Sequence, residues 1–375
     1  MKKHIRVLSI LLALVLLASL FGCAEKPLTV GPLKTMEDPE YGGMFPDISI
    51  EDFNKLGFAF GDSLDVSLSN GKVFEDIPYY SGYFNRRGER LLCGYPGYPH
   101  PDFTQNQVAN SYKQLELAPE DTVTITLREK GKYLDVQNAL NTTYSNDPAD
   151  YAGDVEFANF RSLSGGKIVP DRFFRSASPC NNQHNRAPAV NRMMAQYGVQ
   201  CVLDLADNPE KIGGFLADSS LDIPVFRQIF EAGNVIPAKV TPSFSDETFR
   251  KTVTEGLKVL IQKEGPYLIH CNEGKDRTGF LCVLLEALAG ATMEEMEADY
   301  METYDMYFGI TKESNPTAYN AFRDIRFMDM LLFLTDTKTA EECAKADFAA
   351  GARAYLLQGG MTDSDVDALT ALLTK

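Results

Sequence analysis

The sequence predicts an α/β fold, with a mostly parallel sheet flanked by helices in a C-terminal domain and a smaller β-rich domain before it. From about residue 160 onward, short apolar runs alternate with longer helical patterns, which is typical of a parallel sheet covered by helices. Before that point, apolar and polar residues alternate one by one between turn-forming pairs. With 375 residues, 44% of them hydrophobic, the chain is long enough for two cores.

The smaller domain, at residues 46–160, is predicted to be a barrel or a sandwich. Apolar residues occupy every second position from 64 to 68 and again from 123 to 127. Asn70-Gly71 is a strong hairpin signal, after which Val73-Phe74 resumes the apolar pattern. The Tyr-, Gly- and Pro-rich segment at 79–101 is predicted to be a loop. Because no set of catalytic residue types gathers here, we expect this domain to position its neighbour or to bind a partner.

The second domain, at residues 161–375, is predicted to alternate strands with helices. Strands are predicted near residues 172–176, 200–205, 223–226 and 267–271, and helices near 188–197, 246–263 and 278–289. Residues after 292 carry apolar side chains at helical spacing, and Thr362 is expected to cap a short last helix. In such a sheet, ligands bind beyond the carboxyl ends of the strands. The segment after 271 is therefore the expected position of a functional site.

The decapeptide from His270 to Gly279 carries the chemistry of the chain. It places the thiol of Cys271 and the guanidinium of Arg277 six positions apart around a loop that contains glycine, between an apolar strand and an apolar helix. Backbone N–H groups of such a loop, with a helix N-terminus behind them, form an anion site of about phosphate size. Arg277 would add a bidentate fork to two phosphate oxygens. The same field favours the thiolate at Cys271.

A thiolate in a phosphate site predicts nucleophilic attack on phosphorus. The attack would give a phosphocysteine that water then hydrolyses, while Arg277 and the loop amides hold the charge on the equatorial oxygens. This chemistry requires no metal and no other cofactor, so none is expected.

The loop reads Cys-x5-Arg-Thr and resembles the signature of the protein tyrosine phosphatase superfamily. Its inner Gly-Lys-Asp-Arg is similar to a bacterial subgroup that acts on phosphotyrosine and on phosphoinositides. Further stretches that resemble this subgroup are Phe174-Arg175-Ser176-Ala177, Leu203-Asp204-Leu205 and Gly359-Gly360-Met361-Thr362-Asp363. The resemblance covers residues 160–375 and implies cysteine-dependent phosphatase activity. The residues expected to bind substrate are Asn272, Glu273, Gly274, Lys275, Thr278 and Asp204.

Three aspartates are candidates for the general acid. The chain contains no tryptophan, so it lacks the Trp-Pro-Asp loop that carries the acid in many members of the superfamily. Asp276 is the first choice, because the loop itself places it near the leaving oxygen, although it could instead form a salt bridge that shapes the loop. Asp204 and Asp207, at a predicted strand end, are the alternatives.

Three basic side chains near the loop each have two interpretations. Lys275 could bind a second phosphate of a phosphoinositide, as the resemblance implies, or could be an ordinary solvent-facing lysine. His184 and Arg186 could line the pocket or belong to a turn. His270 is expected to stabilise the loop from the strand.

The N-terminus resembles a bacterial lipoprotein signal. A positive start is followed by an apolar run at residues 7–21 and by Gly22-Cys23. We expect a signal peptide at 1–22, lipidation of Cys23 and a linker at 23–45, or alternatively an uncleaved membrane anchor. Either arrangement places the protein at the bacterial cell membrane, outside the cytoplasm. The remaining cysteines, which match no disulfide or zinc framework, are Cys93, Cys180, Cys201, Cys271, Cys282 and Cys343.

The net charge of -16 argues against nucleic acid as a partner and against broad attraction to anionic lipid. A phosphoinositide would need a local basic pocket. As the resemblance implies, we expect a protein-tyrosine phosphatase acting on phosphorylated protein. The alternatives are an inositol phosphate or phosphoinositide phosphatase and a non-catalytic phosphate-binding lipoprotein. The sequence does not predict the oligomeric state.

Overall fold

The structure, a computed structural model, describes residues 27–39, 42–108, 110–241 and 243–375. These residues form two compact units. The barrel unit contains the described parts of residues 1–83, 90–104 and 109–134, and the α/β unit contains residues 84–89, 105–108 and 135–375. The predicted signal peptide at 1–22 and its Cys23 lie outside the described residues.

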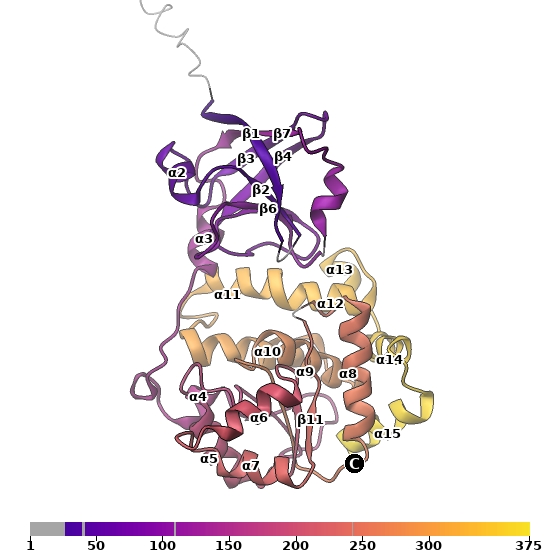
Figure 1. Cartoon of the computed structure of the whole chain (residues 1–375). Helices are drawn as coiled ribbons and strands as arrows, with labels where there is room; N and C mark the ends of the chain where they lie inside the picture. Colours follow the sequence, from indigo (N-terminus) through magenta and orange to yellow (C-terminus); the bar gives the residue numbers. More distant parts are fainter. Residues whose placement is uncertain (1–26, 40–41, 109, 242) are drawn as a thin grey trace, which may run out of the picture. The chain divides into compact units, whose positions relative to one another are not determined.

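The barrel unit is a closed barrel with the strand order β1-β2-β6-β5-β4-β3-β7, in which β7 pairs back to β1 (Figure 1). Its core is filled by the alternate residues of the strands, such as Leu64 and Val66, which are fully buried. The hairpin at Asn70-Gly71 joins β3 and β4 as predicted. Its elements are β1 (Thr29–Glu37), β2 (Met44–Pro46), α2 (Ile50–Lys55), β3 (Ser63–Leu68), β4 (Val73–Tyr80), β5 (Arg90–Cys93), β6 (Asp102–Gln105), η1 (Ser111–Leu115) and β7 (Thr122–Glu129).

Two expectations about this half of the chain are wrong. The predicted linker at 23–45 contains β1, whose apolar Val30 and Leu33 pack on the barrel core although Gly and Pro interrupt the pattern. The predicted loop at 79–101 contains β5, because Leu91 and Leu92 are apolar enough to be buried completely between polar turns.

The α/β unit is built on a five-stranded sheet with the order β11-β10-β12-β9-β8. The pairs β11–β10, β10–β12 and β12–β9 are parallel, and β8 pairs with β9 in antiparallel fashion. Its elements are α3 (Leu134–Leu140), η2 (Pro148–Asp150), α4 (Asp154–Ala158), β8 (Arg161–Ser162), β9 (Phe173–Ser176), α5 (Ala187–Tyr197), β10 (Cys201–Asp204), α6 (Pro209–Ala217), α7 (Pro224–Glu231), β11 (Val235–Pro237), α8 (Glu247–Leu260), β12 (Tyr267–His270), α9 (Asp276–Leu288), α10 (Met293–Phe308), α11 (Pro316–Phe322), η3 (Arg323–Phe327), α12 (Met328–Thr335), α13 (Ala340–Cys343), α14 (Phe348–Gln358) and α15 (Asp363–Thr374).

Helices cover both faces of this sheet, which confirms the α/β class (Figure 1). On one face, Ile269 of β12 packs with side chains of α8, α9, α10 and α14. On the other face, Leu268 packs with side chains of α4, α5, α6 and α7. Successive side chains of β12 thus pack against the helices on opposite faces of the sheet. Because α4 lies before residue 161, this unit begins earlier in the chain than predicted.

The strands predicted near 172–176, 200–205 and 267–271 are confirmed as β9, β10 and β12. The strand predicted near 223–226 is wrong: this segment begins α7, since Pro224 stands at the first helical turn and Phe226 and Ile229 lie on one buried face. The fourth central strand is β11. In the part of the chain that the structure describes, no helix has the length and apolar character needed to cross a bilayer.

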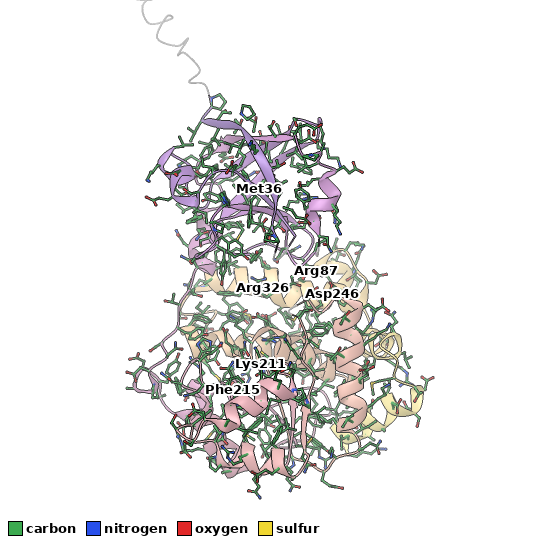
Figure 2. The ribbon with its side chains drawn as sticks, viewed as in Figure 1. Met36, Arg87, Lys211, Phe215, Asp246 and Arg326 are labelled. Carbon is green, nitrogen blue, oxygen red and sulfur yellow. The ribbon has the colours of Figure 1, made fainter. Side chains whose placement is uncertain are left out.

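The predicted helices are confirmed as α5, α8 and α9, and Thr362 caps α15 in a capping box. The start of α8 differs slightly from the prediction. Asp246, labelled in Figure 2, is its N-cap residue and makes no side-chain capping hydrogen bond.

Candidate active site

The loop from Cys271 to Lys275 connects β12 to α9 at the carboxyl end of the sheet. Since β12 lies between β10 and β9, segments from both neighbouring strands surround the loop. Cys271 follows the last residue of β12 and is only 3% exposed. The helix α9 begins at Asp276, so the positive end of its dipole is directed at the loop.

The carbonyl groups of the loop accept hydrogen bonds from elements outside it. The Ser178 N–H donates to the Asn272 oxygen at 3.0 Å, and the Tyr307 hydroxyl donates to the Glu273 oxygen at 2.7 Å. The Arg175 guanidinium donates to the Gly274 oxygen at 2.8 Å. In a trans peptide the N–H points opposite to the C=O. The N–H groups that follow these carbonyls are therefore turned to the inner side of the loop.

None of the backbone N–H groups of residues 272–277 donates to an acceptor within the described chain. A row of such donors, directed to one side of a tight loop, is an anion-binding concavity. Gly274 allows the tight path. Its φ is +69°, and a Cβ there would lie 2.3 Å from the Ser176 carbonyl oxygen.

Arg277 is held from two sides. Its Nη1 donates to the Leu205 oxygen at 3.1 Å and to the Val240 oxygen at 3.4 Å, which follow β10 and β11. Its Nε and Nη2 have no acceptor among the described residues, so this edge of the guanidinium is free to bind two oxygens of a phosphate.

A buried ion network supports the loop from behind α9. Arg161 and Arg175 both bind Asp299, and all three side chains are almost completely buried. Burial opposes the charge of Asp299, but the two arginines lower its pKa to about 2. The network fixes Arg175, which holds the Gly274 carbonyl. The sequence analysis did not assign these residues a role, although an arginine inside the apolar strand Phe173–Ser176 was a signal.

The predicted acid Asp276 lies on the first turn of α9, with its side chain 53% exposed. Lys275 is 21% exposed, and its Nζ lies 3.0 Å from Glu273 and 3.8 Å from Asp276. Burial would lower the pKa of Lys275, but Asp276 and Glu273 together raise it. Lys275 is therefore paired with carboxylates and is not an ordinary solvent-facing lysine.

Asp204 and Asp207, the alternative acids, lie at the end of β10. Oδ1 of Asp204 accepts from the N–H groups of Ala206 and Asp207 at 2.8 and 3.0 Å. Burial raises the pKa of Asp204 to about 7 and also raises that of Asp207. Both side chains are buried, at 0% and 1% exposure. Asp204 is thus enclosed beside the loop.

His270 is buried between Asp204 and the loop. Its Nδ1 lies 3.2 Å from the Cys271 carbonyl, and its Nε2 lies 3.7 Å from Oδ2 of Asp204. Burial lowers the pKa of His270 to about 4, so the ring is neutral at pH 7. Thr278, predicted to bind substrate, is fully buried in α9.

His184 and Arg186 differ in exposure and in contacts. His184 Nε2 lies 3.9 Å from Glu273, so this side chain is beside the loop. Arg186 is 1% exposed and packs on four aromatic rings, among them those of Tyr144 and Tyr307. Because it also donates to the backbone of Ser145, it anchors that segment and belongs to the interior.

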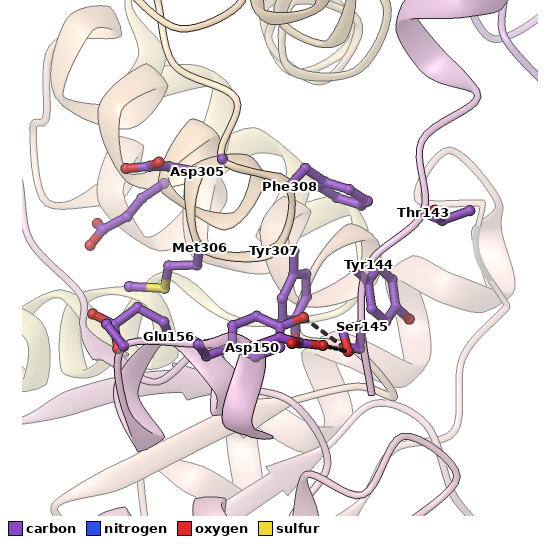
Figure 3. Close-up of a pocket in the computed structure, with 13 residues that line it drawn as sticks. Thr143, Tyr144, Ser145, Asp150, Glu156, Asp305, Met306, Tyr307 and Phe308 are labelled. Atoms are coloured by element: carbon purple, nitrogen blue, oxygen red, sulfur yellow. Dashed lines mark hydrogen bonds between the residues drawn. The ribbon is translucent and has the colours of Figure 1, made fainter. Parts of the chain in front are cut away.

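A pocket of about 520 Å³ adjoins the loop, and Figure 3 shows the residues that line it. Tyr307 belongs both to the pocket wall and to the contact with Glu273, and Tyr144 stacks on it at 5.0 Å between ring centroids. None of the described lining residues is basic. Four of them carry carboxylates: Asp150, Glu156, Glu302 and Asp305.

A thiol at the entrance of an anion-binding loop, beside a guanidinium with a free edge, defines the site of a cysteine-based phosphatase. The model of the tyrosine phosphatase family matches residues 155–375, which is more than half of the chain. The chain therefore belongs to the tyrosine phosphatase family.

Similar chains occur among solved structures. The core catalytic domain of the PP-IP phosphatase SIW14 from S. cerevisiae, in complex with citrate, is 17% identical over 45% of this chain and 85% of that chain, with a TM-score of 0.27. A second structure of the Siw14 catalytic core is 17% identical over 53% and 94%, with a TM-score of 0.28. TpbA of P. aeruginosa is 14% identical over 58% and 96%, with a TM-score of 0.24. The comparison with curated proteins finds no match.

Proposed function

We propose that this chain hydrolyses phosphotyrosine in proteins through a phosphocysteine on Cys271. The observation that carries the proposal is the loop itself. Its carbonyls are bound from outside, so its N–H groups and the free edge of Arg277 remain available beside the thiol. The predicted catalytic residues Cys271, Arg277 and Asp276 thus come from one continuous segment.

In the first step Sγ of Cys271 attacks phosphorus, and the bond from phosphorus to the ester oxygen breaks. Arg277 and the loop N–H groups bind the three non-bridging oxygens in both steps. Asp276 donates a proton to the leaving oxygen, which its exposure on the first turn of α9 supports. Water then attacks the phosphocysteine, and Cys271 leaves as thiolate with inorganic phosphate.

Charge around the loop favours a phosphoprotein over a polyphosphate. Lys275, which could have bound a second phosphate, is occupied by Glu273 at 3.0 Å. The adjoining pocket has four carboxylates and no basic lining residue within the described chain. The carboxylates of this pocket would repel the additional phosphates of an inositol polyphosphate, and a peptide with a single phosphotyrosine carries no such additional phosphates.

The test compares phosphate release from a phosphotyrosine peptide, a phosphoinositide and inositol hexakisphosphate, with the Cys271→Ser chain as control. We expect the peptide to be the best substrate and the variant to lose turnover by on the order of 10⁴-fold or more. Preference for either inositol compound would overturn the substrate proposal. Phosphate binding without release from any of the three would identify a binding protein instead.

We propose further that Cys23 anchors the chain by lipid to the outer side of the bacterial cell membrane. The positive start, the apolar run at residues 7–21 and Gly22-Cys23 support this proposal. Mass spectrometry of the chain expressed in bacteria should find a diacylated N-terminal Cys23. An unmodified chain beginning at Met1 would contradict it.

A further inference from the structure

Three acidic or thiol side chains meet on the carboxyl edge of the sheet, beside the catalytic loop. Cys180 follows β9, Asp204 ends β10, and Asp207 lies three residues later. One ligand atom from each, the sulfur and two carboxylate oxygens, lie within 4.8 Å of one another. All three side chains are at most 1% exposed. This group, together with the adjacent His270, is called the acceptor cluster below.

The acceptor cluster contains polar atoms without partners. Within the described chain, Oδ2 of Asp204, Oδ2 of Asp207 and Nε2 of His270 are buried and make no hydrogen bond. The other carboxylate oxygens are engaged: Oδ1 of Asp204 caps the turn, and Oδ1 of Asp207 lies 3.7 Å from Lys211 of α6, labelled in Figure 2. Buried polar atoms in proteins are nearly always satisfied, so three neighbouring exceptions point to a missing partner.

The tautomer of His270 shows that the missing partner is positive or a donor. Its Nδ1 lies 3.2 Å from the Cys271 carbonyl, which can only accept, so Nδ1 carries the hydrogen. In the neutral ring Nε2 is then an acceptor, and it faces Oδ2 of Asp204 at 3.7 Å. Two acceptors that face each other require a proton or a cation between or beside them.

We propose that Cys180, Asp204 and Asp207 bind one zinc-type divalent ion. A thiolate with carboxylates suits a late first-row divalent ion, whereas Mg²⁺ and Ca²⁺ prefer oxygen ligands alone. The three ligand atoms lie within 4.8 Å of one another, whereas ligands at about 2.0–2.3 Å from a tetrahedral ion are about 3.3–3.8 Å apart, so binding would draw the three side chains closer together. On binding, the Cys180 thiol releases its proton to solvent as the metal–sulfur bond forms. Water completes the coordination, and Nε2 of His270 is the nearby acceptor for its hydrogen.

The proposed site would couple the ion to the nucleophile without using the ion in the reaction. Within the acceptor cluster, His270 stands between Asp204 and the Cys271 carbonyl, so a bound ion would fix the ring and the start of the loop. The site goes beyond the proposed function, because ion binding requires no turnover. A proton held by Asp204 is the rival account of the same unpartnered atoms.

The test uses the Cys271→Ser chain, in which the nucleophile cannot compete as a thiolate ligand. Titration with Co²⁺ should give a thiolate-to-cobalt charge-transfer absorption, and dialysis against zinc should leave close to one zinc per chain. Adding Cys180→Ser should abolish the absorption, and adding Asp207→Asn should weaken zinc binding by at least about tenfold. Cys201→Ser is the matched control, since Cys201 is a buried cysteine of β10 outside the acceptor cluster and its loss should change neither reading.

Circular dichroism of each variant separates loss of the site from loss of the fold. If Cys180→Ser does not fold, the folded Asp207→Asn chain decides. An absorption that survives Cys180→Ser, or no retained zinc in the Cys271→Ser chain, would overturn the metal site and favour the proton on Asp204.

Discussion

The two sides of the catalytic loop have opposite polar character. On the inner side, the N–H groups of residues 272–277 and the edge of Arg277 are donors without acceptors in the described chain. Behind the loop, Asp204, Asp207 and His270 each present one buried acceptor atom that receives no hydrogen bond within the described chain. The first arrangement fits an anion and the second fits a proton or a cation. Unsatisfied polar groups of one sign therefore indicate the charge of the missing ligand.

The largest expected effect concerns the buried ion network around Asp299, which supports the loop that carries the N–H donors. Asp299→Asn would remove the buried carboxylate that pairs with both Arg161 and Arg175, which costs about 3–5 kcal/mol of unfolding free energy. Denaturant unfolding measures this loss. Asp363→Asn, at an exposed pair with Arg353, is the control and should change stability by less than about 1 kcal/mol. Equal effects at both sites would mean that the buried network does not support the loop.

The second prediction concerns the guanidinium of Arg277 on the inner side of the loop. Arg277→Lys keeps a positive charge but cannot bind two phosphate oxygens at once, so kcat/KM should fall by about 10²–10³-fold. Steady-state kinetics with a phosphotyrosine peptide checks this. Arg353→Lys, on the exposed surface of α14, should leave the rate unchanged. A fall below tenfold at Arg277 would show that phosphate binds elsewhere.

The third prediction concerns the proton. Asp276→Asn should lower the rate of hydrolysis of the phosphotyrosine peptide by about 10²-fold. It should lower the rate for an aryl phosphate with a good leaving group much less. The ratio of the two rates is the reading, because a merely structural role would lower both equally. An equal loss for both substrates would mean that Asp276 only shapes the loop, and Asp207 would then become the candidate general acid.

The smallest effect tests the acceptor cluster through pH. Because burial raises the folded pKa of Asp204 to about 7, above its unfolded value, the folded state binds the extra proton. In the metal-free parent, this group stabilises the fold at low pH, and the contribution is lost as pH rises through about 7. Asp204→Asn removes this pH-dependent loss. The unfolding free energy of the variant minus that of the parent should therefore rise by about 2 kcal/mol from pH 5 to pH 7.

Denaturant unfolding of both chains in the presence of a chelator measures the difference. His270 has a folded pKa lowered to about 4 and contributes in the opposite direction, but it is present in both chains. A difference that does not change with pH would mean that Asp204 is charged throughout this range.

The sequence predicted what is local. The apolar run of β12, Gly274 and the spacing from Cys271 to Arg277 lie in one segment, so their arrangement follows from the strand, the turn and the helix. The alternation at residues 64–68 likewise predicted β3. These features depend on neighbours in the chain, which a sequence shows directly.

The sequence could not show the tertiary contacts between elements that are distant in the chain. Tyr307 and Arg175 reach the loop from α10 and β9, and Cys180 meets Asp204 only because β9 and β10 flank β12. The segment at 223–226 misled the prediction because an apolar run of four residues fits a strand as well as the buried face of α7.

The central claim is the covalent role of Cys271, and rapid quenching tests it most directly. Excess phosphotyrosine peptide is mixed with the chain for milliseconds, acid stops the reaction, and mass spectrometry examines the peptide that contains residues 267–278. Our account predicts one phosphate on Cys271, which disappears in Cys271→Ser. Release of phosphate by a Cys271→Ser chain at the parent's rate, with no phosphoenzyme in the parent, would contradict it.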